Sequence, residues 1–121
     1  MKSNKEIVAE FYEKVFNNWD LSELDDYMLD SYRQHSPEVA DGKKGFIEFM
    51  HMFLGNHPKT EIIKLLQDED MVCVFFKCSM DHGVVAKVFD LYRLENGKLA
   101  EHWDCTMRVD NMDCLCPNGQ F

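Results

Sequence analysis

The sequence predicts an α+β fold in which N-terminal helices pack against a curved antiparallel sheet that encloses one pocket. Two observations predict this class. Apolar residues recur at helical spacing before Pro58 and fall into strand-like segments after it. Turns of hairpin length separate those later segments, so neighbouring strands are expected to run antiparallel. A chain of 121 residues has room for one hydrophobic core, and we expect a single domain over residues 1–121.

The first helix has a clear start signal. Ser3 and Glu6 have capping-box spacing and an apolar stripe follows them, which predicts a helix over residues 4–18. A short second helix is expected around three apolar residues at i, i+3 and i+7, namely Leu21, Leu24 and Met28.

An aromatic third helix is predicted over residues 46–54, and it ends before Pro58. The segment before it, residues 32–37, is bounded by Pro37 and Gly42. This boundary predicts a short extended segment followed by a loop.

Four strands are expected in the second half of the chain. They are predicted over residues 60–67, 71–80, 84–94 and 99–109. Asn96-Gly97, a pair favoured in tight hairpins, joins the last two strands. Residues 110–121 show no periodicity and are expected to form an irregular tail.

Composition disfavours several kinds of partner. The formal net charge of −9 repels phosphate backbones and anionic membranes, so neither nucleic acid nor a membrane is expected as a partner. The N-terminus has no secretory signal, and no apolar stretch approaches the roughly 20 residues that span a bilayer. The five cysteines match no zinc or disulfide framework. We therefore expect a cytoplasmic protein with reduced thiols.

Strand alternation singles out one carboxylate. In the strand over residues 84–94, Asp90 is the only charge on a face that also carries Val88 and Tyr92. A carboxylate held among apolar side chains must be hydrogen-bonded or retain its proton. Such a group suits proton transfer near neutral pH. The alternative is that Asp90 lies on the surface of an edge strand.

The last strand supplies possible partners for Asp90. Alternation places Leu99, Glu101, Trp103, Cys105 and Met107 on one face, and Ala100, His102, Asp104, Thr106 and Arg108 on the other. The hairpin brings this strand beside the strand of Asp90. Whether His102 and Asp104 face bulk water or a pocket decides their role.

Two segments resemble the SnoaL-like family. Residues 32–39 resemble its "Y-x-Q-H-N-P" segment, and residues 89–104 resemble its "D-I-F-R-x-x-N-G-K-I-x-E-H-W-D" segment. The family belongs to the superfamily named for nuclear transport factor 2, which includes ketosteroid isomerase and polyketide cyclases. The resemblance covers residues 5–109. It implies a cone-shaped fold with a deep pocket and a homodimer formed through the outer sheet face, where Trp103 and Met107 would suit the contact.

The resemblance also implies roles for single residues. Asp90 matches the Asp that acts as an acid/base in SnoaL-type cyclases and as a hydrogen-bond donor in ketosteroid isomerase. Tyr12 matches a helix tyrosine that supplies a pocket hydroxyl, although it could equally be plain core. Ser36 stands where many relatives have Asn, and no Asp nearby corresponds to the general base of ketosteroid isomerase. Residues 71–80 also lack the histidines of many relatives.

The first hypothesis is therefore a cofactor-independent isomerase, lyase or cyclase that transfers a proton next to the carbonyl of a small apolar ligand. Its catalytic residues would be Asp90, His102 and Asp104. Its substrate-binding residues would be Tyr12, Tyr32, Gln34 and His35. The second hypothesis is a non-catalytic ligand-binding or dimerisation module of the same fold. The third is a metal site built from His35, His102 and Asp104, although no close pair of histidines supports it.

Overall fold

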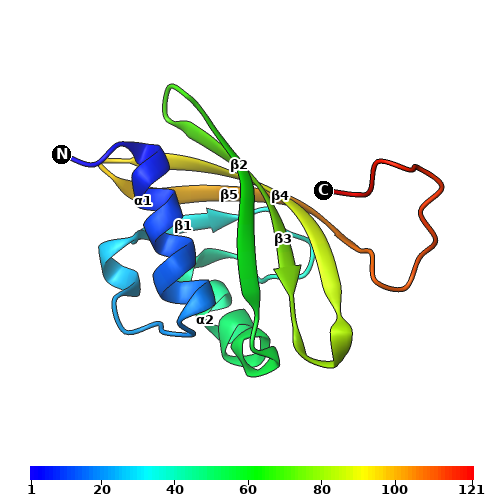
Figure 1. The fold of residues 1–121 in the computed structure, drawn as a ribbon. Coiled ribbons are helices and arrows are strands. Elements are labelled where there is room, and N and C mark those ends of the chain that lie inside the picture. The colour runs from blue at the N-terminus through cyan, green and yellow to red at the C-terminus, as the bar shows by residue number, and fades with distance from the viewer.

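The computed structural model describes residues 1–121, which form two α-helices and a five-stranded sheet. Figure 1 shows that the sheet is curved and that the helices pack against it. The strand order is β1-β5-β4-β3-β2. The strands are β1 (Met28–Gln34), β2 (Lys59–Asp68), β3 (Met71–Ser79), β4 (Val85–Glu95) and β5 (Lys98–Arg108). The predicted α+β class is confirmed, and β2 to β5 lie close to the four predicted strands.

Helix α1 (Asn4–Phe11) begins at the predicted cap, where the Ser3 hydroxyl accepts the backbone N–H of Glu6 at 3.2 Å. The helix continues over Tyr12–Asn17 with π-helical geometry. The predicted helix therefore exists, but its second half is wider than an α-helix. Such insertions are frequent at functional sites, and this one begins at the buried Tyr12.

The prediction of a second helix was wrong. Only a single 3₁₀ turn, Leu24–Asp26, forms there, and Met28 opens strand β1. This strand pairs in parallel with β5, so the sheet is mixed rather than wholly antiparallel. The partners are far apart in sequence, and β1 has an irregular burial pattern that hides its strand period.

Helix α2 (Gly42–Phe53) runs on through a 3₁₀ turn and stops before Pro58, as predicted. It packs on β1, whereas α1 crosses β2 and β3. The tight β4–β5 turn is also confirmed, because Asn96 and Gly97 both have positive φ angles of 49° and 76°. Both helices thus cover the same face of the sheet, and the hydrophobic core lies between the helices and that face.

Strand β5 contains a bulge that the alternation argument missed. Arg93 pairs with Glu101, but Leu94 pairs with Leu99, which leaves Ala100 as an extra residue. Leu99 and Ala100 are consequently both buried. Leu99 does not share the outer face with Glu101, and the predicted alternation holds only beyond the bulge.

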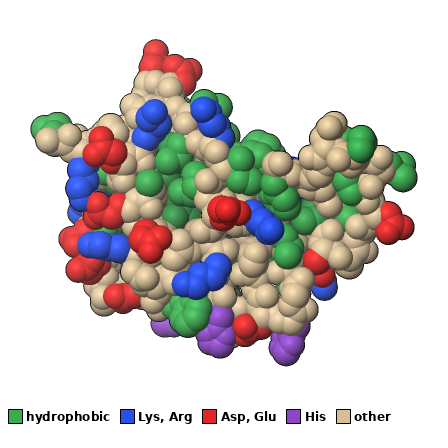
Figure 2. All heavy atoms as spheres, in the orientation of Figure 1, with side chains coloured by type: hydrophobic (Ala, Val, Ile, Leu, Met, Phe, Trp, Pro, Cys, Tyr) green, Lys and Arg blue, Asp and Glu red, His purple; other side chains and the backbone are tan.

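The surface is mixed in charge. Figure 2 shows acidic and basic side chains interspersed around hydrophobic ones on the face in view. Residues 110–121 form no helix or strand, as predicted for the tail. No helix is long and apolar enough to cross a membrane.

Candidate functional site

A cavity of about 460 Å³ lies between the inner face of the sheet and α2. Its wall is mainly apolar and includes Phe16, Phe46, Phe49, Phe53, Phe76 and Val88. A few polar side chains from β1, β4 and β5 interrupt this wall. Concave, mostly apolar sites of this size with few polar groups are typical of small-molecule pockets.

The polar end of the cavity is set by the register of β4 and β5. Asp90 lies opposite Asp104, and Tyr92 lies opposite His102, so all four side chains share one face. Strand β4 is the centre of the sheet, and the Asp90 residue is only 5% exposed. These positions exclude an edge-strand location for Asp90. They also show that His102 and Asp104 border the cavity.

Both oxygens of Asp90 have hydrogen-bonding partners within the protein. Oδ1 lies 3.0 Å from Nε2 of His102. Oδ2 accepts a hydrogen bond from the Tyr12 hydroxyl. The Tyr92 hydroxyl lies 3.3 Å from the same oxygen and 2.8 Å from the Tyr12 hydroxyl. This network compensates for the burial of a carboxylate in an apolar wall, as the sequence requires.

The two tyrosines remain hydrogen-bond donors at any ordinary pH. Burial raises the pKa of both Tyr12 and Tyr92 well above the usual range, and the negative charge of Asp90 adds to the shift. Neither hydroxyl therefore acts as a base. Their contribution is to hold and stabilise Asp90.

Gln34 fixes the tautomer of His102. The side-chain carbonyl Oε1 of Gln34 accepts the backbone N–H of Ser36 at 3.0 Å, which sets the orientation of the amide. The same oxygen lies 2.7 Å from Nδ1 of His102, so Nδ1 must carry a proton. One further proton then lies between Nε2 of His102 and Asp90. Either His102 is an imidazolium beside a carboxylate, or it is neutral beside a protonated Asp90.

Asp104 differs from Asp90 in its hydrogen bonding. Its Oδ2 accepts the hydroxyl of Thr106 at 2.8 Å. Its Oδ1 is shielded from solvent and has no hydrogen-bond partner. Buried polar atoms without a partner are rare in folded proteins, and a catalytic role is one explanation for them.

His35 does not belong to this constellation. It follows Gln34 in the chain, so the two side chains leave the backbone on opposite sides. The His35 ring stacks on Trp103 at 4.7 Å, and its Nε2 lies 2.6 Å from Glu101. The prediction that His35 binds the substrate in this cavity is therefore wrong, because His35 does not line the cavity.

The two predicted tyrosines lie behind the cavity wall. Tyr12 and Tyr32 are buried and are not among the lining residues. The Tyr12 hydroxyl donates a hydrogen bond to Asp90, and the Tyr32 hydroxyl accepts a hydrogen bond from Nε2 of Gln34 at 3.0 Å. Tyr92 does line the cavity but was missing from the predicted site. Its position two residues after Asp90, on the same strand face, was the signal that could have found it.

The donors proposed for a metal do not converge. His35 lies away from the cavity that His102 and Asp104 border. No group of three or more His, Cys, Asp or Glu side chains has the arrangement that could hold a metal ion. The donor geometry thus contradicts the third hypothesis.

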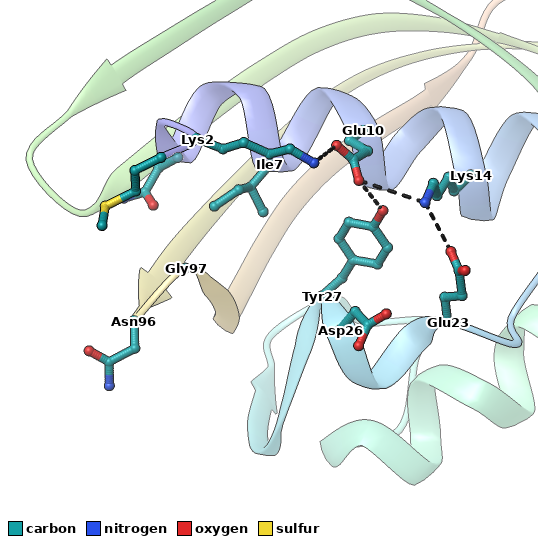
Figure 3. Close-up of a pocket in the computed structure, with 11 residues that line it drawn as sticks. Lys2, Ile7, Glu10, Lys14, Glu23, Asp26, Tyr27, Asn96 and Gly97 are labelled. Carbon is teal, nitrogen blue, oxygen red and sulfur yellow. Dashed lines mark hydrogen bonds and ion pairs between the residues drawn. The ribbon is translucent and has the colours of Figure 1, made fainter.

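A larger hollow of about 780 Å³ lies elsewhere, beside the N-terminal part of α1. Figure 3 shows that Lys2, Glu10, Lys14 and Glu23, which line this hollow, are linked by ion pairs. Glu10 pairs with Lys2 and accepts the Tyr27 hydroxyl, and Lys14 pairs with Glu23. Because the charged groups of Lys2, Glu10, Lys14 and Glu23 are already paired and the wall of this hollow is mostly polar, the 460 Å³ cavity is the better candidate site.

The fold and cavity define a class of small α+β proteins in which a curved sheet and two helices enclose a ligand-sized pocket. The chain belongs to the SnoaL-like polyketide cyclase family, whose sequence profile matches residues 6–115. No curated protein matches the chain at a significant level.

Solved structures share this fold. IdmH from Streptomyces antibioticus, a candidate polyketide cyclase, has a TM-score of 0.76 at 17% identity, covering 87% of this chain and 92% of its own. A candidate polyketide cyclase from Acidithiobacillus ferrooxidans has a TM-score of 0.79 at 18% identity, covering 91% and 92%. AclR from Streptomyces galilaeus, a candidate hydroxylase, has a TM-score of 0.74 at 20% identity, covering 85% and 77%. At these identities the similarity shows the fold alone.

Proposed function

We propose that the cavity binds a small, largely apolar carbonyl compound and transfers a proton at the carbon next to its carbonyl, without a cofactor. One observation carries this proposal. Asp90, His102 and Asp104 meet at one end of an apolar cavity, and among them only Asp104 has an oxygen without a hydrogen-bond partner. The names of the fold relatives, two of them candidate polyketide cyclases, are compatible with chemistry of this kind.

The geometry favours catalytic roles for Asp90 and Asp104 that differ from those in the first hypothesis. Both oxygens of Asp90 are occupied by protein donors, so Asp90 is poorly placed to receive a proton from a substrate. Asp104 is the better base, since one of its oxygens is unmatched. His102 and Asp90, which share a proton, line the same cavity as Asp104 and would stabilise the developing enolate electrostatically. Positioned acid/base groups of this kind contribute about 10²–10⁴ in rate.

The test is exchange of carbon-bound hydrogen. Phenyl ketones with enolisable α-protons are incubated with the protein in D₂O, and ¹H NMR follows the loss of the α-proton signals. The wild-type protein is expected to accelerate exchange, and Asp104→Asn is expected to remove at least 90% of the acceleration. Asp113→Asn, a matched change in the exposed tail, is expected to leave it unchanged.

A non-catalytic binding module is the second candidate. The observation that favours it is the complete hydrogen bonding of Asp90 inside the protein, which is also typical of a buried network that only fixes structure. Saturable binding of the ketones without any exchange would establish this alternative. Dimerisation through the outer sheet face remains a prediction, for which exposed Phe89 and Met107 offer apolar surface.

A further inference from the structure

Arg108 is the only Lys or Arg side chain among the residues that line the cavity. It lies on β5 with Asp104 and Thr106, and the three alternate positions face the cavity side of the sheet. Their backbones are spaced by roughly 7 Å from each residue to the next, which places Arg108 about 14 Å along the strand from Asp104. The cavity edge thus carries a carboxyl group at one point and a guanidinium group at another.

The guanidinium is fixed from one side. Nε and Nη2 of Arg108 donate to the two oxygens of Asp110 at 2.9 and 3.0 Å. Asp110 is itself held by the backbone N–H of Val85 at 3.0 Å. These hydrogen bonds, with that from Arg108 the largest cause, lower the pKa of Asp110 to about 2, so the pair stays ionised under ordinary conditions.

This arrangement leaves part of the guanidinium free. Arg carries five N–H donors, and Asp110 takes one from Nε and one from Nη2. The two N–H groups of Nη1 and the second of Nη2 have no protein acceptor among the hydrogen bonds of Arg108. They form the end of a planar fork, which matches a carboxylate in bidentate geometry.

Building on the proposed function, we propose that Arg108 is a specificity-determining residue that binds a carboxylate carried by the substrate. The preferred substrates are elongated compounds, apolar in the middle, with an enolisable carbonyl near Asp104 and an acidic group several carbons away. The other acidic groups of the cavity, Asp90, Asp104 and Glu38, would repel such a carboxylate anywhere else along the wall. Arg108 would therefore also fix the direction in which the ligand lies.

A matched pair of ligands tests this inference by isothermal titration calorimetry. The probes are 7-oxo-7-phenylheptanoate and its uncharged methyl ester. Wild-type protein is expected to bind the acid about tenfold more tightly than the ester, and added salt should reduce that preference. Arg108→Gln should bind both compounds with the affinity that the wild type has for the ester. Arg108→Lys should retain part of the preference, because it keeps the charge but loses the fork.

Three results would overturn the inference: equal affinities of wild-type protein for acid and ester, an undiminished preference in Arg108→Gln, or no binding of either compound. A purely structural role of Arg108 as an anchor for Asp110 would lower the urea midpoint of Arg108→Gln without changing the affinity ratio.

Asp104→Asn separates this inference from the proposed function. If Asp104 is the base, that variant loses exchange while keeping its preference for the acid, and if no protein catalyses exchange, the preference for the acid still decides the role of Arg108.

Discussion

The side-chain carbonyl of Gln34 lies 2.7 Å from Nδ1 of His102 and holds a proton on that nitrogen. The backbone N–H of Ser36 prevents the amide from turning over. Nε2 of His102 is therefore left to share one proton with Asp90. A hydrogen bond at one side of the imidazole thus determines what the ring can do at the other side, a principle known from many histidines with assigned roles.

The tautomer can be observed directly. In protein labelled with ¹⁵N-histidine, we expect Nδ1 of His102 to carry a proton, because it lies beside the side-chain carbonyl of Gln34. Gln34→Leu should remove this control and give a mixture of ring tautomers. The measurement is a long-range ¹H–¹⁵N correlation spectrum of both proteins. An unprotonated Nδ1 in the wild type would contradict the proton count at the site.

Removal of the Tyr12 hydroxyl should destabilise the protein. Tyr12→Phe deletes a fully buried donor to Asp90, and we expect a loss of about 1–3 kcal/mol in the free energy of unfolding. Tyr27→Phe is the matched control, because its hydroxyl donates to the partly exposed Glu10. This change should cost less than about 1 kcal/mol. Urea unfolding measures both values, and equal losses would argue against a special role for the Asp90 network.

Four of the five cysteines should divide into two reactivity classes. Cys105, Cys114 and Cys116 are exposed and should react with iodoacetamide at pH 8 within minutes. Burial raises the pKa of the Cys78 thiol to about 12, so its thiolate is almost absent at pH 8. Cys78 borders the cavity and should be modified only after unfolding. Mass spectrometry of time points gives the order, and early modification of Cys78 would show that the cavity opens readily.

Glu101, on the outer face of the sheet, should make the free energy of unfolding depend on pH in the acid range. Its hydrogen bond with His35, followed by that from Arg93, lowers its pKa from 4.5. A carboxylate with a lowered pKa stabilises the folded state above its unfolded pKa, and this contribution is lost as the pH falls through the folded value. Glu101→Gln should therefore cost about 0.5–1 kcal/mol at pH 7 and less below pH ~4. Urea unfolding at the two pH values checks this, and an equal cost at both would contradict it.

Local patterns predicted the inward position of Asp90 correctly. A single charge on an otherwise apolar strand face, next to a well-defined Asn96-Gly97 turn, was enough to place Asp90 and His102 together. Turn chemistry and strand alternation depend only on neighbours in the chain, so they can be recognised in one sequence. The same reasoning missed the bulge at Ala100, because an extra residue leaves no marker when both it and Leu99 are small or apolar.

Other parts of the site depend on contacts between distant segments. Met28 fits an apolar helical spacing as well as a strand, and only the parallel pairing with Leu99 decides between them. His35 was predicted to bind the substrate together with Gln34, its neighbour in the chain. Once Gln34 lies in a strand, His35 must point to the other side. The unmatched oxygen of Asp104 depends on which donors surround it, and no spacing in the chain reveals that.

The most direct test of the account is the rate of α-proton exchange in D₂O for 7-oxo-7-phenylheptanoate, measured for wild type, Asp104→Asn and Asp90→Asn. Wild type is expected to accelerate exchange by at least about 10²-fold over buffer, and Asp104→Asn is expected to remove nearly all of this acceleration. Asp90→Asn should lower the rate less, because it disturbs the hydrogen-bonded network beside the enolate but leaves the base. Exchange that is no faster with wild type than with Asp104→Asn, in samples where calorimetry shows that the ligand is bound, would contradict the proposed proton transfer.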